Sequence, residues 1–297
     1  MRKEIKTTVW KDKVKNKKVD IKQDVSNRIV ARLEDVDSFE MPFASFQSKN
    51  IASGKFYRGI NIMLLAFAPY NSPYWGTYKQ WTSKGAQVRT GEKATHIVFW
   101  KMRKVKEEDE NGEEVEKTIP LSRYYPVFNA EQVDGWEAPK HGMVDETEII
   151  FSADCFFARL GMKVETRNEG RACYKPLDDE IQMPPRQAFN ATKTSSATEA
   201  YYSTLAHECT HATGHKERCD REMNSYAAEE LVAEIGAAML CGQLGISNEM
   251  RDDHVAYIKS WLKALNNDKT FIFKAASKAQ EAVDWMETKQ EVLKKAA

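Results

Sequence analysis

Residues 207–211 read His-Glu-Cys-Thr-His, which is an HExxH motif. The stretch from Ala200 to Ala206 contains no proline or glycine, so the motif is expected to lie on a helix. Positions i and i+4 of a helix share one face, so His207 and His211 can reach one divalent ion with Glu208 beside them. This pattern predicts a zinc site in which Glu208 takes a proton from the attacking water.

A catalytic zinc ion usually has three protein ligands and leaves one position for water. Glu230 begins the segment Glu-Leu-Val-Ala-Glu and is predicted as the third ligand, with Glu234 one turn later to orient a ligand histidine. This spacing resembles that of the gluzincin metallopeptidases, whose second helix supplies the third ligand in NExxSD or NExxAE. Glu229 stands where those families often have Asn, so Glu229 is the alternative ligand.

A rival pattern lies in the same segment. The run from His211 to Glu217 imitates the metzincin motif HExxHxxGxxH, but Glu217 replaces its third histidine, which makes Glu230 the better candidate. His215 is expected either to lie past the helix end or to assist an oxyanion, and it is left outside the metal site. Tyr226 is expected to pack rather than to polarise a carbonyl. The alternative to any metal site is a solvated helix that carries two histidines by chance.

The zero net charge of the chain conceals an asymmetry. Residues 1–106 carry 22 Lys and Arg against 9 Asp and Glu, and residues 51–106 carry 10 positive residues against Glu92 alone. Such an excess at one end of a chain indicates a module that binds a polyanion. The alternative is a basic surface without a partner.

Aromatic side chains lie inside this basic part, where residues 74–81 read Tyr-Trp-Gly-Thr-Tyr-Lys-Gln-Trp. Aromatic faces stack on unpaired bases while cations neutralise phosphates, so the mixture predicts non-specific binding of single-stranded nucleic acid. Tryptophan is also an ordinary core residue, so at least one of Trp75 and Trp81 is expected in the core. The candidate DNA-binding residues are Arg58, Tyr74, Trp75, Tyr78, Lys79, Trp81, Lys84, Arg89 and Lys93.

The remaining pattern predicts mixed α and β structure. The apolar run 60–67 can be helix or strand, 95–106 and 118–129 predict a hairpin with an acidic tip, and 170–175 is a candidate edge strand for an extended peptide. Predicted helices lie at 23–35, 77–84, 198–213, 225–244, 253–265 and 271–293.

The stretch 132–144, rich in glycine and proline, predicts a domain boundary near residue 140. The expected fold class is α+β with two domains. Residues 1–140 would form a basic α/β DNA-binding domain. Residues 141–297 would form a mostly helical, gluzincin-like metallopeptidase domain with a small sheet.

Longer motifs carry a family resemblance. The chain contains FYRGIN at 56–61, GAQVRTGEK at 85–93, VFNAEQ at 127–132, YYSTLAHECTHATGH at 201–215 and YAAEELVAEIGA at 226–237. In this order they resemble the ArdC anti-restriction family. The resemblance implies a single-stranded-DNA-binding domain, a metallopeptidase fold, and protection of incoming plasmid DNA from host restriction.

Two functions fit these features. The first is an anti-restriction protein that binds single-stranded DNA and carries a peptidase site for a host protein, with zinc or another divalent metal. The second is a DNA-binding protector whose zinc site is structural or catalytically vestigial. Glu208 favours catalysis, because a structural HxxxH site does not need that carboxylate. An acidic two-metal cluster for chemistry on DNA itself is not evident.

The sequence also restricts the compartment. No apolar stretch is long enough to cross a membrane, and the N-terminus lacks the apolar core of a secretory signal. The five cysteines form an odd set without a CxxC pair. We therefore expect no membrane partner, a reducing cytoplasm, and no cysteine-ligated zinc.

Overall fold

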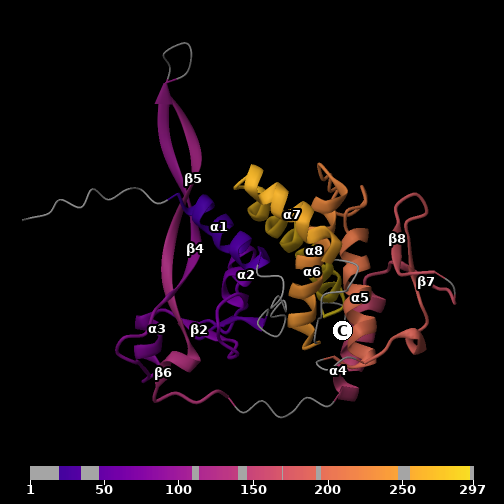
Figure 1. The fold of residues 1–297 in the computed structure, drawn as a ribbon, viewed down its shortest axis with the longest axis horizontal. Coiled ribbons are helices and arrows are strands. Elements are labelled where there is room, and N and C mark those ends of the chain that lie inside the picture. The colour runs from indigo at the N-terminus through magenta and orange to yellow at the C-terminus, as the bar shows by residue number, and fades with distance from the viewer. Residues whose placement is uncertain are drawn as a thin grey trace, which may run out of the picture.

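The computed structural model describes residues 20–34, 47–108, 114–139, 146–168, 170–191, 195–246 and 255–294. The fold is mixed α+β with two domains, as the sequence predicts (Figure 1). A long hairpin stands on one side, a group of helices fills the middle, and a small sheet covers the far side. The predicted boundary near residue 140 and the basic start of the chain lie outside the described residues.

The N-terminal part is built on a four-stranded sheet of order β1-β2-β5-β4, which are Lys49–Asn50, Tyr74–Gly76, Glu114–Asn129 and Thr95–Glu108. Strands β3 (Gln87–Val88) and β6 (Val133–Asp134) form a separate antiparallel pair. The helices of this part are α1 (Ile21–Glu34), α2 (Ile60–Ala66) and α3 (Tyr78–Ser83). The ambiguous run at 60–67 is therefore a helix, and it is buried on nearly all sides.

The predicted hairpin is present and long. Strands β4 and β5 pair antiparallel from Thr95 opposite Val127 to Glu108 opposite Glu114. The turn of its acidic tip lies outside the described residues. Helices α1 and α2 pack on one side of the hairpin, toward the helical part of the molecule (Figure 1).

Two tryptophans of this part are core residues. Trp75 and Trp81 are 1% and 0% exposed. Trp81 packs with Ala86, Val88 and Val133, and its indole Nε1–H donates a hydrogen bond of 2.9 Å to the Phe128 carbonyl. The sequence predicts at least one of the two rings in the core, and both lie there. Their place among the candidate DNA-binding residues is corrected, because a buried ring has no free face for a base.

The C-terminal part is mostly helical, with helices α4 (Glu146–Arg159), α5 (Ala197–Ala212), α6 (Tyr226–Leu244), α7 (Val255–Asn267) and α8 (Phe271–Lys294). Its small sheet has the order β7-β9-β8, which are Lys163–Thr166, Glu180–Met183 and Cys173–Lys175. The last four helices agree with the sequence prediction to within about two residues. Helix α4 and strand β7 were not predicted from the sequence.

Helices α5 and α6 are well defined at their ends and pack closely. Ser196 and Glu199 form a capping box at the start of α5, and the Ser225 hydroxyl caps α6. A Cβ at Gly236 of α6 would lie 2.5 Å from Cγ2 of Thr210 on α5. Glycine at this position therefore lets the two helix backbones approach.

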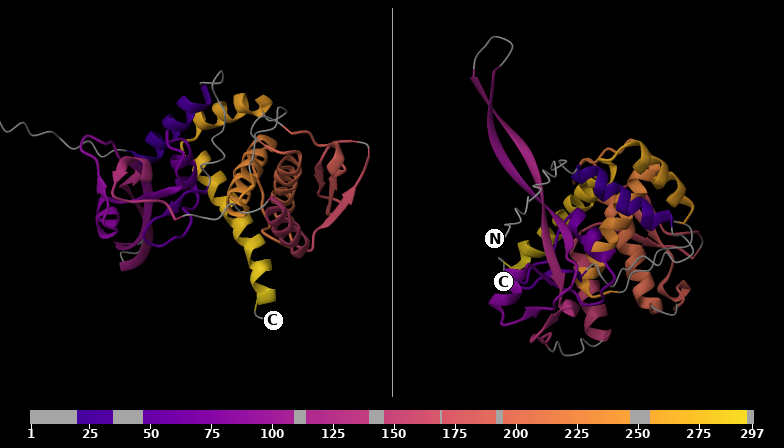
Figure 2. Two further views of the ribbon diagram at one scale, coloured as in Figure 1. Left: turned by 90° about the horizontal axis from the view of Figure 1, so that it is seen from below. Right: turned by 60° about the vertical axis from the view of Figure 1, so that its left-hand side comes forward.

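The two parts share a continuous core. Val25 and Ile29 of α1 belong to the same buried cluster as residues of α6, α7 and α8, and α1 lies beside α7 (Figure 2). Polar contacts reinforce the junction, because Arg58 forms an ion pair with Asp284 and the Gly59 N–H donates to Gln280 Oε1. The N-terminal part is therefore stabilised by the helices that follow it.

The core position of Trp81 generates a stability prediction. Trp81→Phe should lower the free energy of unfolding by about 2–3 kcal/mol, because it removes buried volume and leaves the Phe128 carbonyl without its donor. Urea denaturation measures this change. Phe151→Leu, an exposed change on α4, is the control and should alter it by less than about 0.5 kcal/mol. Wild-type stability of the Trp81 variant would contradict the core assignment.

Candidate functional site

Two helices bring three potential metal ligands together. His207 and His211 lie one turn apart on α5, and their Nε2 atoms are 3.1 Å apart. Glu230, near the start of α6, places one carboxylate oxygen 3.4 Å from Nε2 of His207 and the other 3.6 Å from Nε2 of His211. One donor atom from each residue lies within 4.8 Å of the other two.

This spacing fits a small divalent cation. An ion that binds nitrogen and oxygen at ~2.0–2.2 Å in a tetrahedral arrangement holds its ligand atoms about 3.4 Å apart. The separations here are 3.1 Å between the two Nε2 atoms, and 3.4 and 3.6 Å from these atoms to the two oxygens of Glu230, so they bracket that value. Two imidazoles and one carboxylate are also the ligand types that such an ion takes in zinc enzymes.

Each histidine also contacts a second carboxylate through its Nδ1 atom, on the side of the ring away from Nε2. Nδ1 of His207 lies 3.4 Å from Glu234 Oε1, and Nδ1 of His211 lies 3.2 Å from Glu229 Oε1. A hydrogen bond at Nδ1 directs Nε2 toward the shared point and fixes the tautomer. Glu234 therefore lies where the sequence placed an orienting carboxylate. Glu229, the alternative ligand, contacts the outer side of His211 instead.

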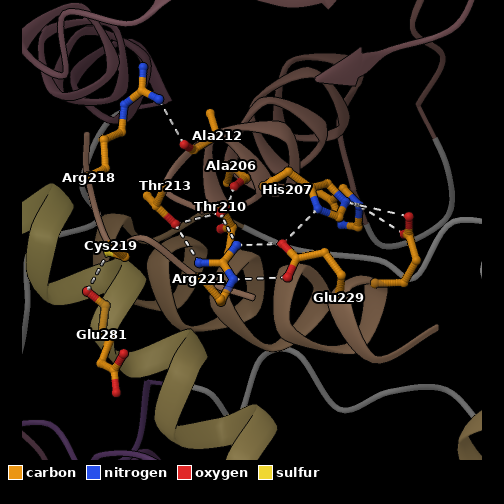
Figure 3. Close-up of polar contacts among 12 residues, drawn as sticks. Ala206, His207, Thr210, Ala212, Thr213, Arg218, Cys219, Arg221, Glu229 and Glu281 are labelled. Atoms are coloured by element: carbon orange, nitrogen blue, oxygen red, sulfur yellow. Dashed lines mark hydrogen bonds and ion pairs between the residues drawn. The ribbon is translucent and has the colours of Figure 1, made fainter. Parts of the chain in front are cut away.

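Arg221, which no sequence motif marks, anchors this arrangement. Its buried guanidinium donates to both carboxylate oxygens of Glu229, at 2.5 and 2.9 Å. It also donates to the Thr210 carbonyl at 2.8 Å and to Oγ1 of Thr213 at 2.9 Å (Figure 3). Arg221 thus ties the end of α5 to the start of α6. A lone arginine in a loop carries no motif by which the sequence alone could reveal this role.

The electrostatics favour ionised carboxylates. Burial would raise the pKa of Glu230, but hydrogen bonds from His207 and His211 outweigh burial and hold that pKa far below its usual range. Burial also acts to raise the pKa of Glu229, and Arg221 and His211 lower it further than burial raises it. Burial lowers the pKa of His211, yet its hydrogen bonds with the two glutamates give a net increase. The site is a negative pocket suited to a cation.

The candidate ligands line a cavity of about 600 Å³. Glu208 lies in its wall and is otherwise buried, while Cys173 and Tyr174 bring strand β8 to the same cavity. Strand β8 pairs with β9 and lies at the edge of its sheet among the described strands. The segment 170–175 is therefore at the cavity, where the sequence analysis expected a peptide-binding edge.

The positions of Tyr226, His215 and Glu217 can now be compared with the roles that the sequence predicts for them. Tyr226 is 64% exposed and lines the cavity, so the expectation that it packs in the interior is corrected. His215 follows the end of α5 and also lines the cavity. It does not belong to the group of possible metal ligands, which is His207, His211 and Glu230 among the described residues. Glu217 is exposed and is not a lining residue, so the metzincin pattern has no counterpart in this site.

The candidate DNA-binding residues differ in their exposure and contacts. Lys79, Lys84 and Lys93 are exposed. Tyr78 is also exposed, at 48%, while Tyr74 packs edge-on against Trp136. Trp75 and Trp81 are in the core, as described above.

The two arginines among these candidates are engaged by carboxylates. Arg58 forms its ion pair with Asp284, and Arg89 contacts Glu92 at 2.8 Å and Asp134 at 3.5 Å. The structure therefore leaves fewer free cations and aromatic faces in this segment than its composition suggests.

Within the described residues, no helix has the length and apolar character needed to cross a membrane. The five cysteines are all unpaired.

Two family descriptions match consecutive parts of the chain. Residues 19–128 match the N-terminal domain of anti-restriction factor ArdC, and residues 151–278 match a zincin-like metallopeptidase. The chain is 39% identical to the protein y4eC of Sinorhizobium fredii over 94% of this chain and 95% of that protein. It is 37% identical to the DNA primase TraC of Escherichia coli over 82% of this chain, which is 24% of that longer protein.

Solved structures of an ArdC protein are also similar to this chain. The metal-free crystal structure of the antirestriction ArdC protein from the R388 plasmid is similar with a TM-score of 0.73 and 42% identity, covering 91% of this chain and 98% of that one. The Mn(II)-bound structure of that protein is similar with a TM-score of 0.71 and 39% identity over the same shares.

The network around Arg221 generates a second prediction. Arg221→Lys should weaken divalent-metal binding by about 10- to 100-fold, because a lysine cannot hold both oxygens of Glu229 and the two acceptors on α5. Calorimetric titration of the metal-free protein with Zn²⁺ measures the affinity.

Arg218→Lys is the matched control. Arg218 makes a bidentate pair with Asp179 and donates to the Ala212 carbonyl, but it does not contact Glu229 in the described structure (Figure 3). This control should lower thermal stability and leave the metal affinity unchanged. Equal metal affinity of Arg221→Lys and wild type would show that the network is not needed for the site.

Proposed function

This chain belongs to the ArdC anti-restriction family, and we propose that it binds single-stranded DNA, carries a zinc-dependent peptidase site, and protects incoming plasmid DNA from host restriction. The observation that carries the peptidase half is the convergence of His207, His211 and Glu230 on one point of a cavity that Glu208 also lines. Zinc is proposed because two imidazoles and one carboxylate form its usual catalytic ligand set.

The proposed ligands would hold the ion through Nε2 of His207, Nε2 of His211 and the Glu230 carboxylate. When bound, the ion supplies Lewis-acid chemistry, which polarises a carbonyl and makes water more acidic. Glu234 and Glu229 keep the two imidazoles in the required tautomer and orientation. Arg221 keeps Glu229 ionised and in place.

Glu208 is the proposed general base. It follows His207 directly in the chain, so it lies beside the ligands without occupying the point where their donor atoms meet. Its carboxylate would accept a proton from the attacking water and pass it to the leaving amine. Tyr226, exposed in the cavity wall, is the proposed hydrogen-bond donor to the carbonyl oxygen of a substrate.

An extended peptide is the proposed substrate, and a host protein its source. Strand β8 borders the cavity at a sheet edge, where main-chain groups can pair with an added strand. All five cysteines are free, which is consistent with action in the cytoplasm. We assign the peptidase to residues 141–297 and DNA binding to residues 1–140.

The DNA-binding half rests on charge. Residues 51–106 carry 10 Lys and Arg against one acidic residue, and Lys79, Lys84 and Lys93 are exposed among them. Cations of this kind neutralise phosphates and give binding without sequence preference. This part of the chain also matches the N-terminal domain of anti-restriction factor ArdC over residues 19–128.

The second candidate function is a DNA-binding protector whose metal site is structural. The observation that would favour it is the shared core, since a metal that stiffens α5 and α6 would also stiffen the helices that support the N-terminal part. Glu208 and the open cavity argue against it, because a structural site is usually closed and has no use for an additional carboxylate.

A third prediction separates these two functions. His207→Ala should abolish metal occupancy, because two remaining ligands are too few, while Glu208→Gln should retain about one metal ion per chain. Mass spectrometry of the purified proteins measures the metal content. Protection of conjugated plasmid DNA in a restricting recipient strain then measures the biological activity.

The peptidase proposal expects Glu208→Gln to lose protection and proteolysis while it keeps metal and thermal stability. Full protection by that variant would support the structural alternative instead. A normal metal content in His207→Ala would overturn the ligand assignment for either function.

A fourth prediction concerns DNA. The affinity of the full chain for an oligo(dT) strand should fall linearly with salt on a log–log scale, with a slope near −0.7 for each phosphate contact. The full chain is the appropriate material because α1 and α2 pack against α7 and α8. Fluorescence anisotropy at several salt concentrations measures the slope. Affinity that does not change with salt would overturn the electrostatic basis of binding.

A further inference from the structure

The β4–β5 hairpin has two faces that differ in their surroundings. Side chains alternate along a strand, and residues opposite one another in an antiparallel pair share a face. The inner face includes Val98, which is buried, and Trp100, whose ring lies 6.0 Å from that of Phe273 on α8. This face is the one that packs against the helices.

The opposite face, here called the outer face, includes Ile97, Phe99, Lys101, Arg103, Leu121, Arg123 and Tyr125. The register places Phe99 opposite Arg123 and Ile97 opposite Tyr125. Lys101 and Arg103 follow Phe99 at successive outward positions of β4, in steps of ~7 Å. Both strands are long and regular here, so the order of these side chains is fixed by the ladder of backbone hydrogen bonds.

Two aromatic rings are exposed on the outer face. Phe99 and Tyr125 are 52% and 42% exposed, and they form an edge-to-face pair with centroids 5.5 Å apart. Large apolar side chains on the surface of a strand attract other chains, so such a pair usually marks a binding surface. These two rings offer what the buried Trp75 and Trp81 do not, an aromatic face that a ligand can reach.

Cations adjoin the aromatic pair. Lys101, Arg103 and Arg123 are exposed. Among the described residues, none of the three has a carboxylate within ion-pair distance, whereas Arg58 and Arg89 are both paired. The outer face therefore joins unneutralised positive charge to accessible aromatic rings on one rigid surface.

We propose that single-stranded DNA binds along the outer face of the β4–β5 hairpin, with bases on Phe99 and Tyr125 and phosphates at Lys101, Arg103 and Arg123. This inference rests on the proposed DNA-binding function and names its surface. An aromatic ring can stack on a base only when the base is not already stacked in a duplex, so the rings select single strands. The cations supply affinity that is independent of sequence.

The test uses the full chain and a fluorescently labelled oligo(dT) strand, with affinity measured by anisotropy. Phe99→Ala and Tyr125→Ala should each weaken binding about tenfold, the loss expected for one base-stacking contact. Lys101→Gln and Arg103→Gln should each reduce the magnitude of the salt slope by about 0.7. Phe99→Trp should retain the wild-type affinity, because a ring remains at that position.

Phe151→Ala and Lys263→Gln are the matched controls. Phe151 is a more exposed phenylalanine on α4, and Lys263 is an exposed lysine on α7. Neither control should change DNA affinity. Thermal unfolding verifies that each outer-face variant folds like wild type.

Photo-crosslinking provides a measurement that does not depend on a variant. An oligonucleotide with 5-bromodeoxyuridine should crosslink to the peptides that contain Phe99 or Tyr125, as identified by mass spectrometry. Crosslinks confined to other segments would overturn the proposed surface.

The possible outcomes separate failure of the proposed binding surface from failure of the proposed DNA-binding function. Absence of any oligo(dT) binding by the wild type would overturn the proposed DNA-binding function. Wild-type binding with no loss in the outer-face variants would overturn this inference alone. Equal loss of duplex binding in Phe99→Ala would overturn the stacking role, and tighter binding of an RNA strand of the same length would overturn DNA as the occupant.

Discussion

The close packing of α6 against α5 is the constraint on which the candidate metal centre depends. Helix α5 supplies two imidazoles one turn apart, but a third ligand must arrive from another element. Gly236 allows the approach, because a Cβ there would lie 2.5 Å from Thr210. This contact sets the distance at which Glu230 faces both Nε2 atoms, and a shift of about 1 Å at such a contact would separate the donor atoms.

Buried charge gives the site its second property. Arg221, Glu230 and Glu234 are all removed from solvent, and isolated charges in such a place would strongly destabilise the fold. Each is compensated, since Arg221 is paired with Glu229, and Glu230 and Glu234 both contact His207. Although burial acts to raise the pKa values of Glu229 and Glu230, their contacts with Arg221, His207 and His211 lower them, so these two carboxylates favour the ionised form that binds a cation.

In the basic part of the chain, burial decides which aromatic rings a ligand can contact. Its aromatic-rich segment 74–81 contributes Trp75 and Trp81 to the interior and leaves Tyr78 exposed, while the hairpin exposes the paired rings of Phe99 and Tyr125. Composition reports how many rings and cations a segment has, but burial decides which of them a ligand can touch. Because α1 and α2 also pack on α7 and α8, the hairpin and the cavity are connected through one continuous core.

The sequence by itself determined the features that depend on local spacing. The HExxH period predicted His207 and His211 on one helix face, the ELVAE spacing predicted Glu230 with Glu234 behind it, and apolar periodicity predicted the helices that carry them. Tertiary structure decided the features that depend on contacts between distant segments. It brought Glu230 rather than Glu229 to the Nε2 atoms, linked Arg221 to both helices, exposed Tyr226 and buried Trp75 and Trp81. The physical reason is that a helix fixes residues four apart through its own backbone, whereas burial and pairing across helices are fixed only when the core is complete.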